Sequence, residues 1–311
     1  MSGLNSLSRR EFLAQTAALT AASSLPTSSF AQESMLTRAI PGTDEQLPVI
    51  GLGAPDLFFT TPPEDPELPR SLLQAMVDSG GRIFDTPAFF RPDPPDVGGI
   101  VREMNLQDEL FLIGKITVEG KQAAMEHFDK TAANLGREQM DMMLVHNYKD
   151  LASNWAVLKE AKAEGKVRHI GISRTHNADN ETLEQFMRAE RPEIIMLGYN
   201  MHQNEHEERI LPLAQDMGMG VVVVEPFRVI DDGAFFSVTA GKELPDWAAE
   251  FDCESWAQFS LKYILSNPAI TSVITETSSV RHVIDNMRGG YGRLPDQTMR
   301  KRMSEHFYSL L

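Results

Sequence analysis

The chain has 311 residues, of which 42% are apolar and 23% charged, a composition typical of a globular protein and not of a disordered one. The formal net charge is −15, from 44 acidic and 29 basic residues, and no cluster of lysine and arginine indicates a nucleic-acid-binding protein. This length suits a single domain of alternating strands and helices.

The first 31 residues contain the three parts of a twin-arginine export signal in the right order. Residues 8–13 read SRREFL, an Ala- and Thr-rich stretch follows, and residues 29–31 form a small-x-Ala cleavage site. The stretch is too short and too polar to span a bilayer, so we expect no membrane span there. The alternative is an amphipathic helix with two adjacent arginines by chance. We expect a signal peptide over residues 1–31, cleaved after Ala31, with the twin-arginine machinery delivering the mature protein to the periplasm.

Short β-rich runs alternate with amphipathic stretches from residue 33 to the end of the chain. Several runs are almost continuously Val, Ile, Met or Leu, as is typical of strands covered on both faces. The expected strands are Val49–Gly53, Arg82–Asp85, Leu110–Lys115, Met140–His146, Val167–Ser173, Ile194–Tyr199, Gly220–Glu225 and Thr271–Thr275. The expected helices are Pro69–Ser79, Lys121–Leu135, Trp155–Glu164, Asn180–Ala189, Glu207–Met217, Ser255–Leu265 and Val280–Met287.

This alternation predicts one α/β domain over residues 33–311, a (βα)8 TIM barrel closed by eight parallel strands. A short N-terminal hairpin between residues 39 and 49 is expected to plug the barrel floor. A doubly wound sheet is the rival fold, but it would need a glycine-rich turn after the first strand. Gly51 and Gly53 are followed by Asp56 where the third glycine would stand, so the barrel is favoured.

Three ionisable residues stand at the ends of successive apolar strands: Asp85, Lys115 and His146. The C-terminal strand ends carry the chemistry in such barrels. Burying ionisable groups there costs free energy unless they pair, so we expect the three side chains to meet in one site. The alternative is an ion pair that only closes the barrel mouth.

Several segments, in the same order along the chain, resemble aldo-keto reductases: residues 47–53 (LPVIGLG), 84–86 (FDT), 114–115 (GK), 144–146 (LVH), 165–173 (GKVRHIGIS) and 257–263 (AQFSLKY). The resemblance covers about residues 40–286 and implies a nicotinamide-dependent carbonyl reductase acting on a small aldehyde or ketone. It also implies a catalytic tetrad of Asp, Tyr, Lys and His. Asp85, Lys115 and His146 match by position; the lysine would lower the tyrosine pKa, and the histidine would orient the substrate oxygen.

The tyrosine of that pattern, five residues after the aspartate, is replaced by Phe90. Phenylalanine has no ionisable proton, and loss of a positioned general acid costs roughly 10²–10⁴-fold in rate. Tyr148 follows His146 by two residues and is a candidate substitute donor. The alternative for Tyr148 is a loop residue that lines the pocket.

The positions that would hold NADP or NAD also depart from the family pattern. The resemblance places the cofactor against Ser173, Arg174, Glu276, Thr277, Ser278 and Asn286. Of these, Glu276 stands near the expected 2′-phosphate of NADP, which a carboxylate repels. Met196 and Val224 replace the usual Gln and the usual aromatic partner of the nicotinamide. We therefore expect weakened or lost nucleotide binding.

No metal site is expected, and one cysteine excludes an intramolecular disulfide. Cys253 is interpreted as a small buried hydrophobic residue. His202 and His206 have the i, i+4 spacing of metal ligands. However, Asn204 and Glu207 resemble a helix N-cap and its partner, which would place His202 before the helix, so both histidines are interpreted as solvated surface.

Three functions remain open from the sequence. The first is an exported aldo-keto reductase-like oxidoreductase, impaired by the loss of its tyrosine. The second is a pseudoenzyme, in which the barrel binds a ligand or a protein without catalysis. The third is a non-redox enzyme that uses Asp85, Lys115, His146 and Glu225.

The export signal predicts that the native mature protein begins at Gln32. Intact-mass spectrometry of the periplasmic fraction, with N-terminal peptide mapping, should find this form. A twin-lysine variant, Arg9→Lys with Arg10→Lys, should retain the precursor in the cytoplasm. A native protein that keeps residues 1–31 and is found only in the cytoplasm would contradict this prediction.

Overall fold

The structure is a computed structural model that describes residues 34–54, 65–86, 96–174, 180–229 and 233–311. All of them belong to one compact unit, Ser34–Leu311. The expected signal peptide and Phe90 lie outside the described residues.

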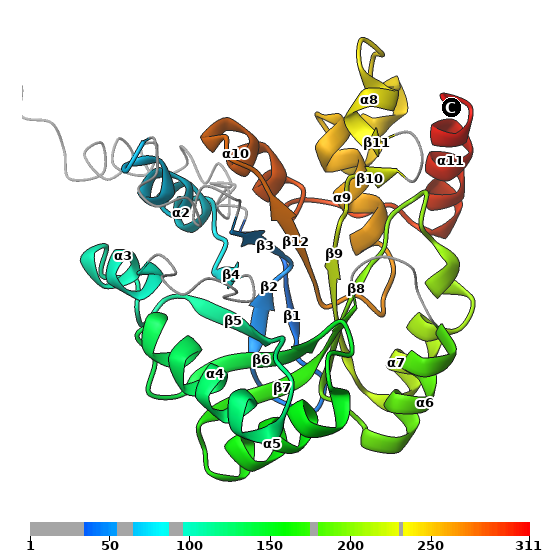
Figure 1. Cartoon of the computed structure of the whole chain (residues 1–311). Helices are drawn as coiled ribbons and strands as arrows, with labels where there is room; N and C mark the ends of the chain where they lie inside the picture. The colour runs from blue at the N-terminus through cyan, green and yellow to red at the C-terminus, as the bar shows by residue number, and fades with distance from the viewer. Residues whose placement is uncertain (1–33, 55–64, 87–95, 175–179, 230–232) are drawn as a thin grey trace, which may run out of the picture. The chain divides into compact units, whose positions relative to one another are not determined.

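Eight parallel strands close into a barrel in the order β12-β3-β4-β5-β6-β7-β8-β9 (Figure 1). They are β3 (Ile50–Gly53), β4 (Ile83–Asp85), β5 (Phe111–Ile116), β6 (Met140–His146), β7 (Val167–Arg174), β8 (Ile194–Gly198), β9 (Gly220–Val224) and β12 (Ser272–Glu276). The TIM-barrel prediction is therefore confirmed. Each strand begins and ends within one residue of its expected position, because a buried parallel strand has an apolar run that stops at polar or glycine residues.

Helices cover the outer face of the barrel (Figure 1). They are α2 (Leu68–Asp78), α3 (Val97–Glu103), α4 (Lys121–Asn134), α5 (Leu151–Ala163), α6 (Asn180–Glu190), α7 (Ile210–Met217), α8 (Phe235–Thr239), α9 (Trp256–Leu265), α10 (Val280–Arg288) and α11 (Gln297–Tyr308). The described residues also form two 3₁₀ helices, η2 (Glu205–Glu207) and η3 (Asp246–Phe251), and a small hairpin, β10 (Arg228–Val229) with β11 (Gly233–Ala234).

The sequence did not predict α3, α8, η3 and α11. The α3 segment reads VGGIVRE, and two adjacent glycines lower its helix propensity. In α11 only the side chains of Met303 and Phe307 are buried, and two apolar residues are too few to identify an amphipathic helix in a mostly polar segment. The helix expected from Trp155 begins four residues earlier, at Leu151, and the one expected from Glu207 is η2 followed by α7.

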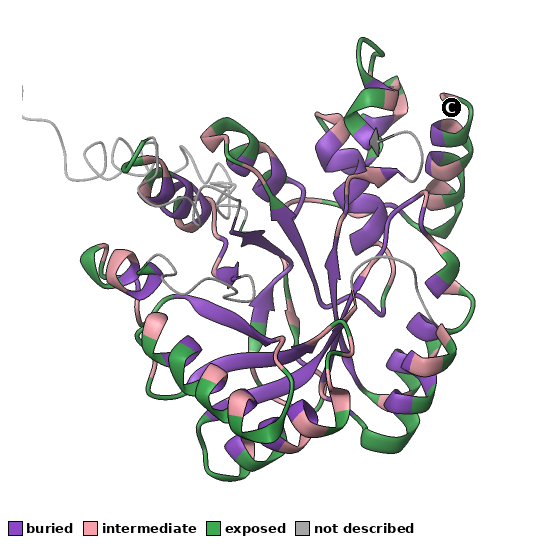
Figure 2. Ribbon diagram, viewed as in Figure 1, coloured by how far each residue is buried: buried purple, intermediate pink, exposed green. Residues whose placement is uncertain are grey.

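Buried residues, coloured purple along the strands in Figure 2, form two clusters. One cluster lies inside the barrel and the other between the strands and the helices. Consecutive residues of a strand point to opposite faces, so each strand contributes to both layers. In β6, for example, Met142 and Leu144 belong to the inner cluster, whereas Met143 and Val145 belong to the outer one. The barrel interior is therefore a packed apolar core.

An N-terminal antiparallel hairpin, β1 (Thr37–Ala39) with β2 (Gln46–Pro48), adds to the inner layer. Its Ile40 and Leu47 are almost fully buried and belong to the cluster that fills the barrel. Arg38 donates hydrogen bonds to the main-chain oxygens of Leu265, Asn267 and Ile270, at the end of α9 and just after it. The hairpin therefore packs into the end of the barrel at which the strands begin.

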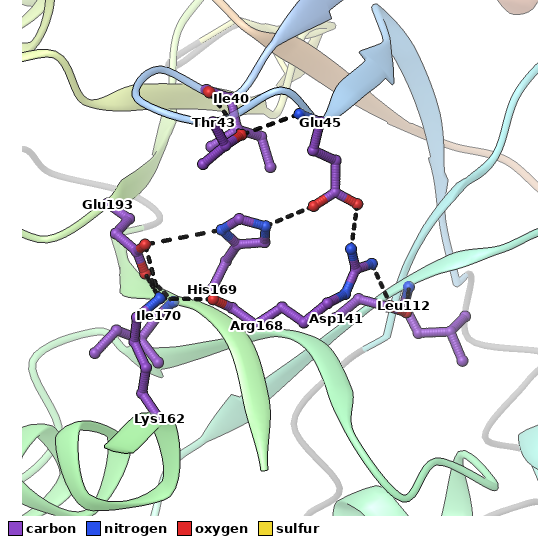
Figure 3. A network of polar contacts seen from close by, with 10 residues as sticks. All are labelled: Ile40, Thr43, Glu45, Leu112, Asp141, Lys162, Arg168, His169, Ile170 and Glu193. Atoms are coloured by element: carbon purple, nitrogen blue, oxygen red, sulfur yellow. Dashed lines mark hydrogen bonds and ion pairs between the residues drawn. The ribbon is translucent and has the colours of Figure 1, made fainter. Parts of the chain in front are cut away.

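A polar network attaches this hairpin to the strands (Figure 3). Glu45 accepts a hydrogen bond from Arg168 at 2.5 Å and lies 2.6 Å from Nε2 of His169. Arg168 also donates to Asp141 at 2.6 Å, and Asp141 accepts the backbone N–H of Leu112 at 2.7 Å. The network thus links the hairpin to β5, β6 and β7.

The network predicts an acid-sensitive contribution of Glu45 to stability. Burial raises the pKa of Glu45, but its contacts with His169 and Arg168 together lower it below the usual value. A carboxyl whose pKa is lowered on folding stabilises the protein above its unfolded pKa of about 4.3, and this stabilisation is lost as the pH falls. Glu45→Gln should therefore reduce the free energy of unfolding at pH 7 by about 1–3 kcal/mol.

Urea denaturation at pH 7 and at pH 3 checks this prediction. The difference in free energy of unfolding between Glu45→Gln and wild type should be smaller at pH 3. Glu160→Gln is the control, because the Glu160–Lys121 pair is about half exposed on both sides. Equal effects of the two substitutions at pH 7 would contradict a special role for Glu45.

Candidate functional site

The strand alternation places the three predicted site residues inside the barrel mouth. On each of three strands, the residue two positions earlier belongs to the cluster that fills the barrel. The pairs are Ile83 and Asp85 on β4, Ile113 and Lys115 on β5, and Leu144 and His146 on β6. Because the three strands are neighbours and parallel, their site residues lie side by side at the C-terminal end.

Lys115 and Asp85 form a buried ion pair. Their side chains are 7% and 11% exposed, and the Lys115 ammonium donates a hydrogen bond to Oδ1 of Asp85. A second ammonium proton is donated to the main-chain oxygen of Thr86 at 2.7 Å. Thr86 is itself fixed, because its hydroxyl donates to the oxygen of Ile113 at 2.6 Å. The ammonium is therefore held in one position by two acceptors.

Burial dominates the electrostatics of Asp85. Desolvation raises the pKa of its carboxyl above the usual value, whereas the charge and hydrogen bond of Lys115 act in the opposite direction. An isolated charge at this depth would be strongly unfavourable, so each partner makes the burial of the other tolerable.

His146 is half-buried and lies beside Ser173 of the neighbouring strand. Its Nδ1 is 2.7 Å from the Ser173 hydroxyl, and Asn147 Nδ2 is 3.0 Å from its Nε2. Ser173, expected from the family pattern at the cofactor, is thus found in contact with a catalytic candidate.

Tyr148 and Arg174 contact each other at the same end of the barrel. The Arg174 guanidinium lies 5.1 Å from the centre of the Tyr148 ring, a cation–π arrangement. The ring also packs against the apolar layer between strands and helices. Asn147 and Tyr148 both have a positive φ, +50° and +56°, and such backbone strain is concentrated at functional sites.

A cavity of about 780 Å³ opens between β12, α9, α10 and the segment after β9. Three of the six predicted cofactor residues line it: Glu276, Thr277 and the buried Asn286. Ser278 follows on the exposed loop between β12 and α10. One wall is aromatic, formed by Phe227, Phe236 and Trp256.

The charged residues of this cavity have both signs. Arg281, His282 and Arg288 line it together with Glu276 and Asp285. The aromatic wall suits a planar ring, and Arg281 in the first turn of α10 suits a phosphate. The Gln258 amide fixes Asp285 through a 2.7 Å hydrogen bond.

Sequence reasoning missed the aromatic wall and Arg281. Phe227, Phe236 and Trp256 come from segments separated by up to 29 positions, and only the fold brings them together. Arg281 lies three residues after Ser278, so its charge was the signal available in the sequence. Glu225, named for a non-redox alternative, forms an ion pair with Arg228 at 3.1 Å.

The expectations for the remaining histidines and the cysteine are partly wrong. His206 is 3% exposed and not solvated surface. Asn204 precedes η2, but Asn200 makes the capping-type contacts, accepting the N–H groups of His202 and Gln203. Cys253 is buried, as predicted, and burial raises the pKa of its thiol to about 12.

Two searches of the described residues were negative. They contain no group of three His, Cys, Asp or Glu side chains placed to hold a metal ion. Within the same residues, no helix is long and apolar enough to cross a membrane.

A closed (βα)8 barrel with a buried acid–lysine pair beside a histidine at the strand ends has the architecture of a barrel oxidoreductase. The model of the aldo/keto reductase family matches residues 49–304. The chain therefore belongs to the aldo/keto reductase family.

Individual relatives are distant. D-galacturonate reductase of Fragaria ananassa is 24% identical over 274 residues, covering 79% of this chain and 83% of that protein. Among solved structures, holo AKR11C1 of Bacillus halodurans has a TM-score of 0.68 at 17% identity, covering 88% of this chain and 96% of the other. An aldo/keto reductase of Klebsiella pneumoniae in complex with NADP and acetate has a TM-score of 0.68 at 20% identity, covering 86% and 94%. At these identities the structural matches show the fold.

The ion pair predicts an asymmetric response to substitution. Asp85→Asn leaves the Lys115 charge buried without its partner and should reduce the free energy of unfolding by about 3–5 kcal/mol. The double variant Asp85→Asn with Lys115→Met removes both charges, so its free energy of unfolding should fall by less than that of Asp85→Asn. Chemical denaturation at pH 7 measures both.

The control is Glu119→Gln, which breaks the exposed Lys149–Glu119 pair and should cost less than about 1 kcal/mol. A double variant less stable than Asp85→Asn alone would contradict this account. It would show that the unpaired Lys115 charge does not destabilise the folded protein.

Proposed function

We propose that the protein binds a nicotinamide nucleotide and reduces a small aldehyde or ketone, at a rate limited by the absence of the family's tyrosine. The observation that carries this proposal is the fixed Lys115 ammonium, held by Asp85 and Thr86 beside His146. A cation so placed stabilises negative charge that develops on a carbonyl oxygen.

The cavity at β12 and α10 fits a dinucleotide. Phe227 and Trp256 provide aromatic surface for a planar base, and Arg281 and Arg288 provide cations for phosphates. The Klebsiella pneumoniae protein of the same fold, in complex with NADP, supports this assignment. When bound, a reduced nicotinamide supplies hydride to the substrate carbon.

The residues of the barrel mouth would divide the remaining work. Lys115 would polarise the carbonyl oxygen, and Asp85 and Thr86 would keep its ammonium in place. The apolar interior below them excludes water, which strengthens each of these electrostatic interactions.

Phe90 favours a second candidate function, a pseudoenzyme that binds ligand without turnover. Both candidates retain the nucleotide cavity and the Lys115 site, and they differ in whether a proton reaches the oxygen. Tyr148 is the proposed substitute donor in the first candidate. We also propose that the protein works in the periplasm, on the strength of the export signal in residues 1–31.

The position of Glu276 predicts that NADP is not preferred over NAD. Its carboxylate lines the cavity and opposes an additional phosphate. Two unit charges 4 Å apart interact by about 1 kcal/mol in water, so Glu276→Gln should improve NADP binding relative to NAD roughly 5-fold. Isothermal titration with both nucleotides measures the ratio.

Glu160→Gln, on the distant surface of α5, should leave the ratio unchanged. A clear preference of the wild type for NADP would show that Arg281, His282 and Arg288 outweigh Glu276.

Phe90 predicts slow or undetectable carbonyl reduction that Phe90→Tyr increases. The family pattern implies that a tyrosine at this position lies near the catalytic lysine, whose positive charge would lower the phenol pKa and favour donation of the missing proton. We expect a gain of at least ~10-fold, which corresponds to about 1.4 kcal/mol of transition-state stabilisation. The assay is reduction of simple aldehydes at saturating NADH or NADPH.

The matched control is Phe89→Tyr, which introduces the same phenol one position away and should give no gain. Brisk reduction by the wild type would mean that Phe90 is not limiting, and Tyr148→Phe would then identify the donor. No gain from Phe90→Tyr, with nucleotide demonstrably bound, would favour the pseudoenzyme.

A further inference from the structure

His146 is contacted at both ring nitrogens by neighbouring side chains. Ser173 lies directly opposite it in the β6–β7 pairing, is fully buried, and has its hydroxyl 2.7 Å from Nδ1. The main-chain oxygen of Ser173 accepts the N–H of Asn147 at 2.8 Å. The position of Ser173 relative to the ring is thus set by the strand register.

Asn147 contacts the other nitrogen. Its Nδ2 lies 3.0 Å from His146 Nε2, and its backbone has a φ of +50°. An amide nitrogen only donates hydrogen bonds, so Nε2 must accept. The single proton of the neutral ring is then on Nδ1, where the Ser173 oxygen accepts it.

We propose that Ser173 and Asn147 are positioning residues that act through His146 and hold it as the neutral tautomer protonated at Nδ1. The catalytic meaning of this inference rests on the proposed function, whereas the tautomer itself can be measured without substrate or nucleotide. With Nε2 as an acceptor, His146 does not donate a hydrogen bond to a bound carbonyl oxygen. The Lys115 ammonium then carries the stabilisation of that oxygen.

The tautomer is measured directly by long-range ¹H–¹⁵N NMR of the full chain labelled at its eight histidines, with His146→Gln assigning the signals. At pH 7.5, Nδ1 of His146 should have a pyrrole-like shift and Nε2 a pyridine-like shift. The opposite pattern in wild type, or a doubly protonated ring at this pH, would overturn the proposal.

Two variants test the two contacts separately. Asn147→Asp places an acceptor against Nε2 on an exposed residue and should move the proton to Nε2. Ser173→Ala removes the acceptor at Nδ1 and should give a mixture of tautomers. The control is Ser272→Ala, a fully buried serine of β12 that donates to the oxygen of Pro48 at 3.0 Å, and it should leave His146 unchanged.

Unchanged His146 shifts in Asn147→Asp would refute the proposal even if Ser173→Ala fails to fold. Since neither nucleotide nor turnover enters this experiment, its failure leaves the proposed carbonyl reduction standing. Conversely, a protein that binds no nucleotide would refute the proposed function while the tautomer result stands.

Discussion

The closed parallel barrel imposes one constraint on which the site depends: every second residue of a strand must face an apolar interior. Inside this interior, Lys115 and Asp85 have little access to solvent. Two charges at this depth are tolerable only when they pair and when their remaining protons and lone pairs find partners. The main-chain oxygen of Thr86 provides such a partner. The geometry of the site therefore follows from the desolvation cost of placing ionisable residues at the ends of buried strands.

The two ends of the barrel use charge differently. At the end where the strands begin, Glu45, Arg168, His169 and Asp141 contact one another and attach the hairpin that covers the interior (Figure 3). At the other end, charged side chains line a cavity, and backbone strain occurs at Asn147, Tyr148 and Glu225. This division matches the general pattern of such barrels, in which one end serves stability and the other end chemistry.

The strands, and the positions of three ionisable residues at their ends, could be predicted because each is encoded locally, as an apolar run with an ionisable residue at its end. Contacts between distant segments could not be predicted from the sequence. The pairing of His146 with Ser173 depends on the β6–β7 register, and the aromatic wall depends on the path of the chain after β9. His206 was predicted incorrectly because residue type favours exposure, whereas the turn that follows β8 buries this ring. The glycine-containing α3 forms because its Val97 and Val101 are buried, a tertiary effect that overrides low propensity.

The buried ion pair also bears on how the barrel is used. Apolar residues of similar volume at the positions of Asp85 and Lys115 would generally stabilise a protein as well as or better than a buried pair. The pair is therefore poorly explained by folding stability. A fixed ammonium at the mouth of a dry barrel has a direct chemical use, which is to bind an oxygen that carries partial negative charge. This use does not require the hydroxyl that Phe90 lacks, because attraction of an oxygen and delivery of a proton are separate tasks. Oxygen binding at Lys115 is thus compatible with both turnover and a purely binding role, and delivery of the proton distinguishes the two.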